Sequence, residues 1–497
     1  MRFMPATASK YFRCASGVIF SLFCFLPLSA NLSPSACTIA MVRGSATIDG
    51  RPLMMKTRDR SDFDQDFIYG AEGLYAYIGT SGAGITNKIY GGVNEVGFAI
   101  INSNAYNFPD TVSGWADDGY IMKLALETCR TVYDFQYILD STNTPGRTLP
   151  ATYGVMDAYG NGIFYEATAG SYFICDWDDS TYAPNGYMVR STFAYNGGPE
   201  HEAQFRHDRA LALLDSGYAE GILSRQYLAQ TVLRDLVNSE ADPYPLPFQG
   251  MTPSSPYGFL HTYTEDMINR ATTRAVVIIQ GIEAGGDPGL ATLWAMAGQP
   301  VTTVALPLWV HAGSVPDEFN GLGYNQSALN SRSEEYRNYL YSLGWPYYKL
   351  DTWRLVDQWG GGLLPYLIEL EDELTARGDS AWAVWEATGL PSTGEIADFQ
   401  NELAATALAD LTQWGPAQTP EVRLEILPGD RILLDWELVQ FNVFERPLEV
   451  SHYTIYGSSE PFLDRLTGDS LTTVDAPPVT LPMLDVLRFY QVRCGTD

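Results

Sequence analysis

Two apolar, β-prone runs flank an Asp-Gly dipeptide near the start of the chain. One run begins at about Thr38, the dipeptide is Asp49-Gly50, and the second run covers residues 53–55. Asp-Gly between two such runs is a signal for a β-hairpin, because Gly tolerates the positive φ angle of a tight turn. A simple hairpin about this dipeptide would place Asp59 opposite Ala40. The end of the second strand would then lie close to the start of the first.

Further along, the pattern predicts both strands and helices. Short β-prone runs bounded by turn signals predict strands within residues 75–78, 91–104, 153–157, 163–167, 187–190 and 268–281. Apolar residues at helical spacing predict helices within residues 121–129, 132–139, 202–214, 224–237 and, in several pieces, 331–411. No repeat or low-complexity tract interrupts this organisation.

The first 36 residues have the composition of an export signal. They contain three basic residues and no acidic residue, and the apolar run at 17–30 is too short to span a membrane. Cleavage after Ala30 would leave a short propeptide for self-cleavage to remove, and cleavage after Ala36 would leave none. We therefore expect a signal peptide and short propeptide over residues 1–36, and a secreted, periplasmic or extracellular protein.

A Gly- and Pro-containing linker at 415–420 divides the rest of the chain. Before it lies a large domain, residues 37–415, whose last part is a helical extension. After it, short alternating strands are predicted at 423–427, 431–436, 452–456 and 487–492. A Trp on an early strand and a Tyr on a late one resemble a fibronectin type III-like β-sandwich, which we expect over residues 421–497.

The chain is strongly acidic. Its formal charge is −29 over 497 residues, and loss of the three bases in the signal changes it to −32. Such a surface argues against nucleic acid and anionic membranes as partners. Four cysteines follow the signal, at positions 37, 129, 175 and 494. We expect Cys129 and Cys175 to be buried thiols, although pairing between them after export is an alternative.

Cys37 is the candidate nucleophile, because it follows the export signal directly. A chain cut before Cys37 would carry a thiol and a free α-amine on one residue. The α-amine titrates at about 7.7–8.0 and the thiol at about 8.5, so the amine can accept the thiol proton near neutral pH. The alternative for a single cysteine is a buried strand residue without chemistry.

Three downstream blocks give the chain a resemblance to a known family. They are Tyr-Gly-Gly-Val-Asn-Glu-Val-Gly-Phe-Ala-Ile-Ile-Asn-Ser-Asn (90–104), Tyr-Gly-Val-Met-Asp-Ala-Tyr-Gly-Asn (153–161) and Ala-Pro-Asn-Gly-Tyr-Met-Val-Arg (183–190). Together with Cys37-Thr38 they occur in the order found in N-terminal-nucleophile (Ntn) hydrolases of the choloylglycine hydrolase and acyl-CoA:isopenicillin N acyltransferase (C45) type. The resemblance covers roughly residues 37–316. It implies an α+β fold, a four-layer αββα sandwich with two antiparallel sheets between helical layers.

The resemblance also implies roles for individual residues. Cys37 would be the nucleophile, Asp59 would hold its α-amine, and Asn104 would donate to the oxyanion. Asp59 itself would lie at a hairpin end, outside the core. Three basic residues would bind substrate or orient the site: Lys56, Arg58 and Arg270, with Arg274 as the second choice for the last of these. Relatives commonly have a further oxyanion-binding Asn after residue 190, where this chain has Ser191-Thr192-Phe193.

The expected function is hydrolysis of a non-peptide, N-acyl amide bond in a small molecule. An acyltransferase and a dipeptidase of the related Cys-starting class would use the same residues, so both remain open. A non-catalytic surface protein also remains open, including a lipoprotein with Cys37 lipidated, although Pro34 departs from the lipoprotein pattern. The five His show no ligand spacing, and no phosphate-binding loop or dinucleotide fingerprint is present, so we expect no metal and no cofactor.

Overall fold

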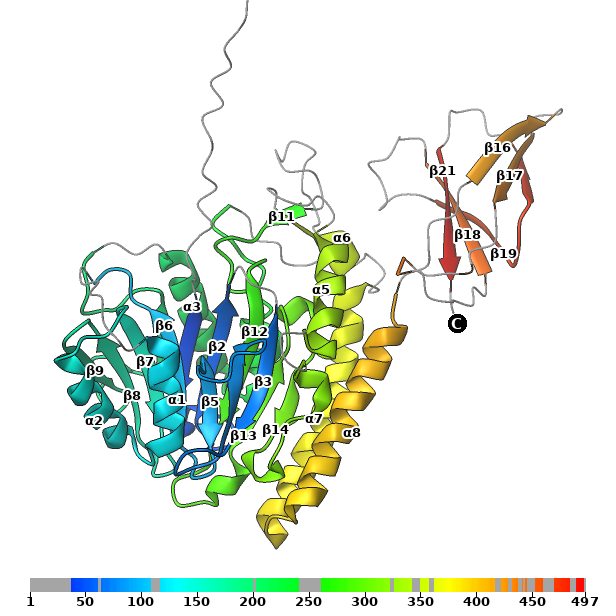
Figure 1. Ribbon diagram of the computed structural model, residues 1–497. Coiled ribbons are helices and arrows are strands. Elements are labelled where there is room, and N and C mark those ends of the chain that lie inside the picture. Colours follow the sequence, from blue (N-terminus) through cyan, green and yellow to red (C-terminus); the bar gives the residue numbers. More distant parts are fainter. Residues whose placement is uncertain are drawn as a thin grey trace, which may run out of the picture. The chain divides into compact units, whose positions relative to one another are not determined.

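The computed structural model of the protein has two large antiparallel sheets with helices on their outer faces (Figure 1). A further group of strands lies near the C-terminus of the chain. The structure describes residues 37–60, 64–108, 117–199, 203–240, 261–321, 326–341, 349–356, 362–415, 422–427, 431–436, 440, 443–444, 452–458, 469–482 and 489–495. The predicted signal segment and most of the predicted linker lie outside these ranges.

The first sheet has six strands and contains both strands of the predicted hairpin at its centre. Every residue of these two strands is buried, which is typical of strands covered on both faces. The strand order is β10 (Tyr187–Ser191), β1 (Thr38–Val42), β2 (Leu53–Asp59), β12 (Thr273–Gln280), β13 (Thr292–Met296) and β14 (Leu306–Leu308).

The hairpin forms, but the predicted register is wrong. Ala40 lies opposite Met55, not Asp59. The connection is wider than a two-residue turn because Thr47 Oγ1 bonds both Gly44 O and Arg51 O at 2.9 Å, and a 3₁₀ segment, η1 (Gly44–Ala46), lies inside it. Side-chain bonds of this kind offer the backbone an alternative to a tight turn.

The second sheet is a seven-stranded antiparallel meander, in which each strand pairs with its neighbour in the sequence. Its strands are β3 (Gln65–Gly70), β4 (Tyr77–Gly82), β5 (Gly91–Asn94), β6 (Ala99–Asn104), β7 (Ala151–Met156), β8 (Gly162–Ala167) and β9 (Tyr172–Asp176). The predicted hairpin over 153–167 is confirmed as β7 and β8, with Met156 opposite Gly162.

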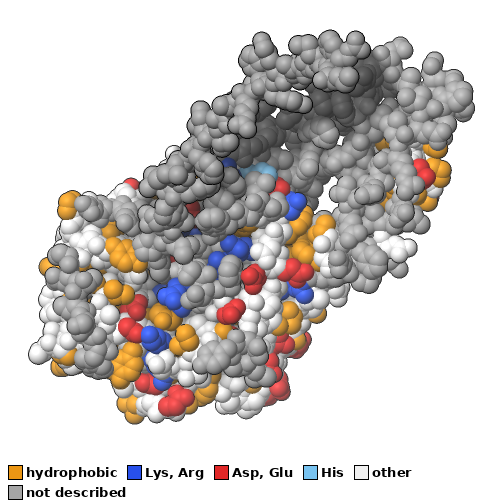
Figure 2. Space-filling model, turned by 45° about the horizontal axis from the view of Figure 1, so that its top comes forward, with side chains coloured by type: hydrophobic (Ala, Val, Ile, Leu, Met, Phe, Trp, Pro, Cys, Tyr) orange, Lys and Arg blue, Asp and Glu red, His pale blue; other side chains and the backbone are white. Residues whose placement is uncertain are grey.

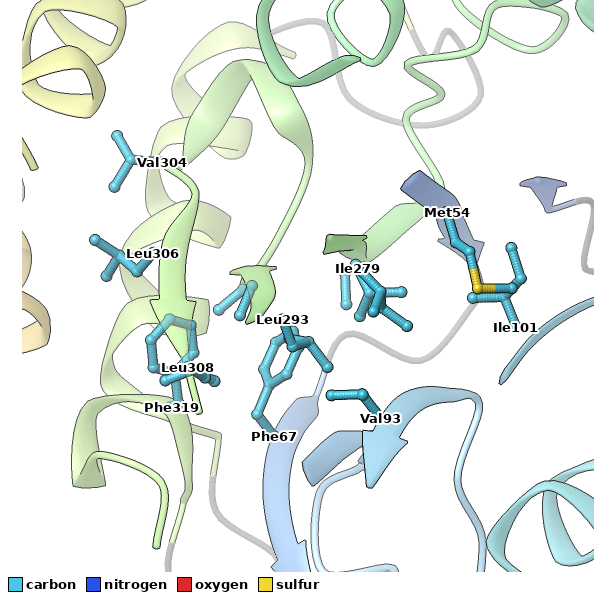
Figure 3. Close-up of a cluster of buried hydrophobic side chains, with 14 of the residues drawn as sticks. Met54, Phe67, Val93, Ile101, Ile279, Leu293, Val304, Leu306, Leu308 and Phe319 are labelled. Carbon is cyan, nitrogen blue, oxygen red and sulfur yellow. The ribbon is translucent and has the colours of Figure 1, made fainter. Parts of the chain in front are cut away.

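The two sheets pack face to face over a common apolar core. Figure 3 shows Met54, Ile279 and Leu293 of the first sheet close to Phe67 and other side chains of the second. Successive strand residues point to opposite faces, so the next residue along β2, Met55, belongs to a different cluster on the outer face. The sheets are thus fixed against each other at the strands that carry Cys37 and its neighbours.

Helices cover the two outer faces and complete four layers (Figure 1). The second sheet is covered by α1 (Asp118–Thr128) and α2 (Val132–Asn143), whose apolar residues share one cluster with its outer face. The first sheet is covered by α3 (Gln204–Glu220), α4 (Arg225–Tyr227) and a π-helical turn, η2 (Leu228–Val232). A capping box fixes the start of α2, because Thr131 and Asp134 exchange side-chain and backbone bonds.

Helices are present within residues 331–411, as predicted, and pack at the β14 edge of the first sheet. The helices of this region are α5 (Ala328–Leu340), α6 (Thr352–Leu355), α7 (Leu363–Thr388) and α8 (Thr393–Gln413). Trp309, just after β14, and Trp385 on α7 form an edge-to-face pair with centroids 4.8 Å apart. A short two-stranded sheet, β11 (His261–Tyr263) with β15 (Lys349–Asp351), lies apart from the two large ones.

The C-terminal strands form two three-stranded antiparallel sheets. One contains β16 (Val422–Leu427), β17 (Arg431–Trp436) and β20 (Val479–Pro482), and the other contains β19 (Asp469–Val474), β18 (His452–Ser458) and β21 (Phe489–Gly495). Trp436 and Tyr453, one from each sheet, pack edge to face at 5.3 Å. The fibronectin type III-like assignment stays a prediction.

The surface carries both signs of charge. On the face in Figure 2, Lys and Arg side chains lie among acidic and apolar ones. No helix in the described ranges has both the length and the apolar character needed to cross a bilayer.

Candidate active site

Cys37 lies one residue before β1, between the two sheets, and is 6% exposed. Its carbonyl oxygen accepts a hydrogen bond from Ser103 Oγ on β6 at 2.9 Å. The N–H of the following residue, Thr38, donates to Thr57 Oγ1 on β2 at 2.9 Å. Cys37 is therefore held by residues of both sheets.

Asp59 is the last residue of β2 and is 1% exposed. The expectation that it lies outside the core is wrong, because β2 is a central strand with β1 on one side and β12 on the other. Its carboxylate accepts from Thr273 Oγ1 at 2.7 Å and from Arg270 Nη1 at 3.4 Å. These bonds compensate for the loss of water around a buried charge.

Arg270 lies shortly before β12, as expected, and links two carboxylates. Besides the bond to Asp59, Arg270 donates to Glu265 through Nη2 at 2.7 Å. Burial acts to lower the pKa of Arg270, but the two carboxylates outweigh it and raise this pKa. The second choice, Arg274, donates through Nε to Arg60 O at 3.2 Å instead. The structure thus places Arg270 beside Asp59.

Lys56 is buried on β2 and donates to Asn102 Oδ1 on β6, and Asn102 in turn donates to Asp118 Oδ2 at 2.7 Å. Burial lowers the pKa of Lys56 to about 8, although the side chain of Cys37 acts in the opposite direction. A lysine with a pKa of about 8 carries its charge at neutral pH and can lose it under mildly alkaline conditions.

Arg58 is also buried and lies against neutral groups. Its Nε donates to Gln65 Oε1, and its guanidinium stacks over the Tyr90 ring at 3.6 Å. Burial lowers its pKa to about 10, and the side chain of Cys37 partly opposes this effect. Arg58 therefore places a charge near the thiol without an ion-pair partner of its own among the described residues.

Arg206 is a further basic residue that the sequence analysis missed. It lies on α3, is 5% exposed, and donates through Nη1 to Glu265 O at 3.3 Å. Burial, followed by the charge of Arg270, lowers its pKa to about 10, whereas Asp59 and Cys37 act in the opposite direction. Only the fold brings α3 over this part of the first sheet, so no local sequence signal marks Arg206.

Several buried basic side chains share electrostatic interactions with Cys37 in the described part of the chain. Of the four basic residues described above, Arg270 forms ion pairs with carboxylates. The other three, Lys56, Arg58 and Arg206, donate hydrogen bonds to neutral groups. Buried positive charges favour negative charge that appears nearby during a reaction, such as the oxyanion of a tetrahedral intermediate.

Asn104 ends β6 and is half-buried. Its Nδ2 donates to the Tyr106 hydroxyl at 2.7 Å. Because the preceding residue, Ser103, bonds the Cys37 carbonyl, Asn104 lies at the same strand end as the nucleophile. The oxyanion role of its side chain stays a prediction.

Thr192 directly follows β10, and its backbone is unusual. Its φ angle is +56°, in the left-handed region that β-branched residues rarely adopt. Its N–H donates to Ser103 Oγ at 3.0 Å, and its carbonyl accepts from Tyr106 N at 3.0 Å. Strained backbone of this kind is frequent at functional sites, and here it adjoins Cys37 through Ser103.

Cys129 and Cys175 are poor nucleophiles. Cys129 and Cys175 are buried free thiols, and burial raises their pKa values to about 12 and about 11. Both are therefore protonated at neutral pH, whereas nucleophilic attack requires the thiolate.

Two carboxylates with no part in this site have structural roles. Glu166 forms a fully buried ion pair with Arg190 at 2.6 Å and accepts the N–H groups of Tyr195 and Asn196. Asp157 accepts the N–H groups of the β7–β8 turn and of Val132. In the described ranges no group of three His, Cys, Asp or Glu residues could hold a metal ion.

No family model and no curated protein matches this sequence. Solved structures do align with it. A mutant conjugated bile acid hydrolase from Clostridium perfringens is 14% identical, with a TM-score of 0.34, over 55% of this chain and 92% of its own. A second mutant of that enzyme is 13% identical, with a TM-score of 0.36, over 59% and 98%. Penicillin V acylase from Agrobacterium tumefaciens is 12% identical, with a TM-score of 0.30, over 55% and 86%.

Proposed function

We propose that the protein is a cysteine hydrolase of the Ntn type that cleaves an N-acyl amide bond. The observation that carries the proposal is the position of Cys37 at the head of β1, beside the strand β2 that ends in the buried Asp59. Thiol and carboxylate also share an environment, because both act on the charges of Lys56 and Arg206.

In the proposed mechanism, processing before Cys37 frees its α-amine. The amine accepts the thiol proton and the thiolate attacks the carbonyl carbon of the substrate. Asp59 accepts a hydrogen bond from the α-amine, while Arg270 and Thr273 keep the carboxylate in place. This arrangement gives one residue both a nucleophile and an oriented base.

The negative charge then moves to the carbonyl oxygen. Asn104 and a backbone N–H would stabilise this oxyanion, and the buried charges of Lys56 and Arg58 favour it. Collapse of the intermediate expels the amine, which leaves with the proton from the α-amine, and a thioester remains on Cys37. Water, deprotonated by the same α-amine, hydrolyses the thioester and releases the acid.

The same residues would also serve the alternative activities. An acyltransferase would use an amine acceptor in place of water, and a dipeptidase would cleave dipeptides but not N-acyl amides. Retention of the segment before Cys37, or lipidation of Cys37, would favour the non-catalytic surface protein, because the α-amine would be blocked.

The decisive experiment combines intact mass and turnover of the exported protein. We expect a mature chain that begins at Cys37, and loss of N-acyl amide hydrolysis in Cys37→Ala. Cys129→Ala is the matched control, since it removes a buried thiol on the far side of the second sheet and should leave turnover intact. A fully active protein that begins at Asn31, or an active Cys37→Ala variant, would refute the proposal.

A further inference from the structure

The peptide unit that joins Cys37 to Thr38 is held by two side-chain hydroxyls. Ser103 Oγ donates to its carbonyl oxygen at 2.9 Å, and Thr57 Oγ1 accepts from its N–H at 2.9 Å. The two hydroxyls come from different sheets, Ser103 from β6 and Thr57 from β2. The plane of this peptide is thus fixed from both ends.

These two bonds lie at the very start of β1. The ladder pairs of this strand begin with Thr38 opposite Ser191 on β10 and with Ile39 opposite Lys56 on β2. Terminal residues fray unless they are tied down, and in a chain that starts at Cys37 the two hydroxyl bonds restrain the first peptide unit.

The left-handed backbone of Thr192 orients the Ser103 hydroxyl. A hydroxyl has one proton to donate, and Ser103 Oγ accepts the Thr192 N–H at 3.0 Å. Its own proton is then available for the Cys37 carbonyl at 2.9 Å, because the other acceptor within reach, Asn104 O, is farther away at 3.4 Å. The positive φ angle of Thr192 accompanies the backbone geometry in which its N–H points to Ser103 Oγ.

Thr38 adds a third hydroxyl contact. Ser191 Oγ donates to Thr38 Oγ1 at 2.9 Å, and both residues are fully buried. The first residue of β1 is thus bonded through its backbone to β2 and through its side chain to β10. This contact restrains Thr38, the residue to which the fixed peptide leads.

We propose that Ser103 and Thr57 are positioning residues for Cys37, and that Thr192 orients Ser103. The inference rests on the proposed nucleophile. With the peptide plane fixed, Cys37 retains rotation only about its Cα–C bond and its side-chain bond. The α-amine and the thiol can then change position only by rotation about these two bonds. Both hydroxyls bond backbone atoms of this peptide unit.

The test compares Thr57→Val, Thr57→Ser and Ser103→Ala in the processed, full-length protein. Val keeps the shape of Thr without the hydroxyl, and Ser keeps the hydroxyl. We expect Thr57→Val and Ser103→Ala to lower kcat per alkylatable Cys37 by roughly 10–100-fold with little change in KM, the effect of misplacing a reacting group. Thr57→Ser should restore most of kcat.

Thr80→Val is the matched control. Thr80 is buried on β4, and its hydroxyl has no hydrogen-bond partner in the described structure, so the same chemical change should leave kcat unaltered. If Thr57→Val and Ser103→Ala lower only the melting temperature, with kcat per active site unchanged, the positioning role is refuted. If Thr57→Val does not fold, the same question is decided by comparing kcat per alkylatable Cys37 between Ser103→Ala and Thr57→Ser.

Cys37→Ala separates this inference from the function on which it rests. An active Cys37→Ala variant removes the proposed nucleophile and the positioning role with it. An inactive Cys37→Ala variant beside a Ser103→Ala variant with normal kcat leaves the proposed function in place and refutes the positioning role alone.

Discussion

Asp59→Asn tests the mechanism most directly, because it removes a charge while keeping the size of the side chain and its bond with Thr273. Asn can still accept from Thr273 Oγ1, which lies 2.7 Å from the carboxylate. It cannot favour an ammonium form of the Cys37 amine as a carboxylate does. We therefore expect turnover to fall by roughly 10²–10⁴-fold, the usual range for losing general acid–base assistance.

The same change has a cost in stability. Removing one partner of a buried ion pair typically costs about 3–5 kcal/mol when the other charge is left alone. Here Arg270 keeps Glu265 at 2.7 Å, so the loss approaches that of one hydrogen bond to a charged group, about 2 kcal/mol. The fold should persist, but with a lower melting temperature.

The assay measures kcat/KM on an N-acyl amide, the melting temperature and the rate of Cys37 alkylation by a small electrophile. Thr273→Val is the matched control, since it removes a hydrogen bond to Asp59 without removing the charge. We expect a comparable loss of stability in Thr273→Val with a much smaller loss of turnover, and slower but continued alkylation in Asp59→Asn. Near-normal turnover in processed Asp59→Asn protein would remove Asp59 from the mechanism.

Three other predictions concern pH, domain organisation and metals. Burial lowers the pKa of Lys56 from 10.5 to about 8, so its charge costs about 3 kcal/mol below pH 8, and this cost declines as the pH rises toward 10.5. In denaturant titrations the stability of Lys56→Met relative to the native protein should therefore be greatest near neutral pH and should fall by about 3 kcal/mol as the pH rises toward 10.5; a difference that does not narrow between about pH 8 and pH 10 would contradict this. A chain ending at residue 418 should be processed and keep its turnover, and loss of turnover in a folded, processed product would show that the C-terminal strands contribute to the site. Activity should survive chelators, whereas inactivation that one added metal reverses would reveal a metal requirement.

The sequence by itself determined most of the elements of the large domain. The apolar runs around Asp49-Gly50 predicted β1 and β2, and the helical spacing after residue 120 predicted α1 and α2. These features are local, because the periodicity that distinguishes strands from helices depends only on consecutive residues. The export signal identified Cys37 as a candidate and the family resemblance identified Asp59, and the structure buries both side chains.

The hairpin register was not predictable from the turn signal. The Asp-Gly dipeptide favours a tight turn, but Thr47 and the 3₁₀ segment η1 widen the connection and shift the pairing to Ala40 with Met55. The burial of Asp59 could not be predicted from the sequence for a related reason. Its position between β1 and β12 depends on a strand more than two hundred residues later in the chain, as does its bond to Thr273.

Only the tertiary structure decided what surrounds Cys37. Ser103 and Thr57 are ordinary strand residues in the sequence, and Arg206 is an ordinary basic residue on a helix. They reach the site because the two sheets stack face to face and α3 covers the first sheet. Contacts between layers depend on how elements distant in the sequence pack against each other. The pattern of apolar residues within one element does not predict that packing.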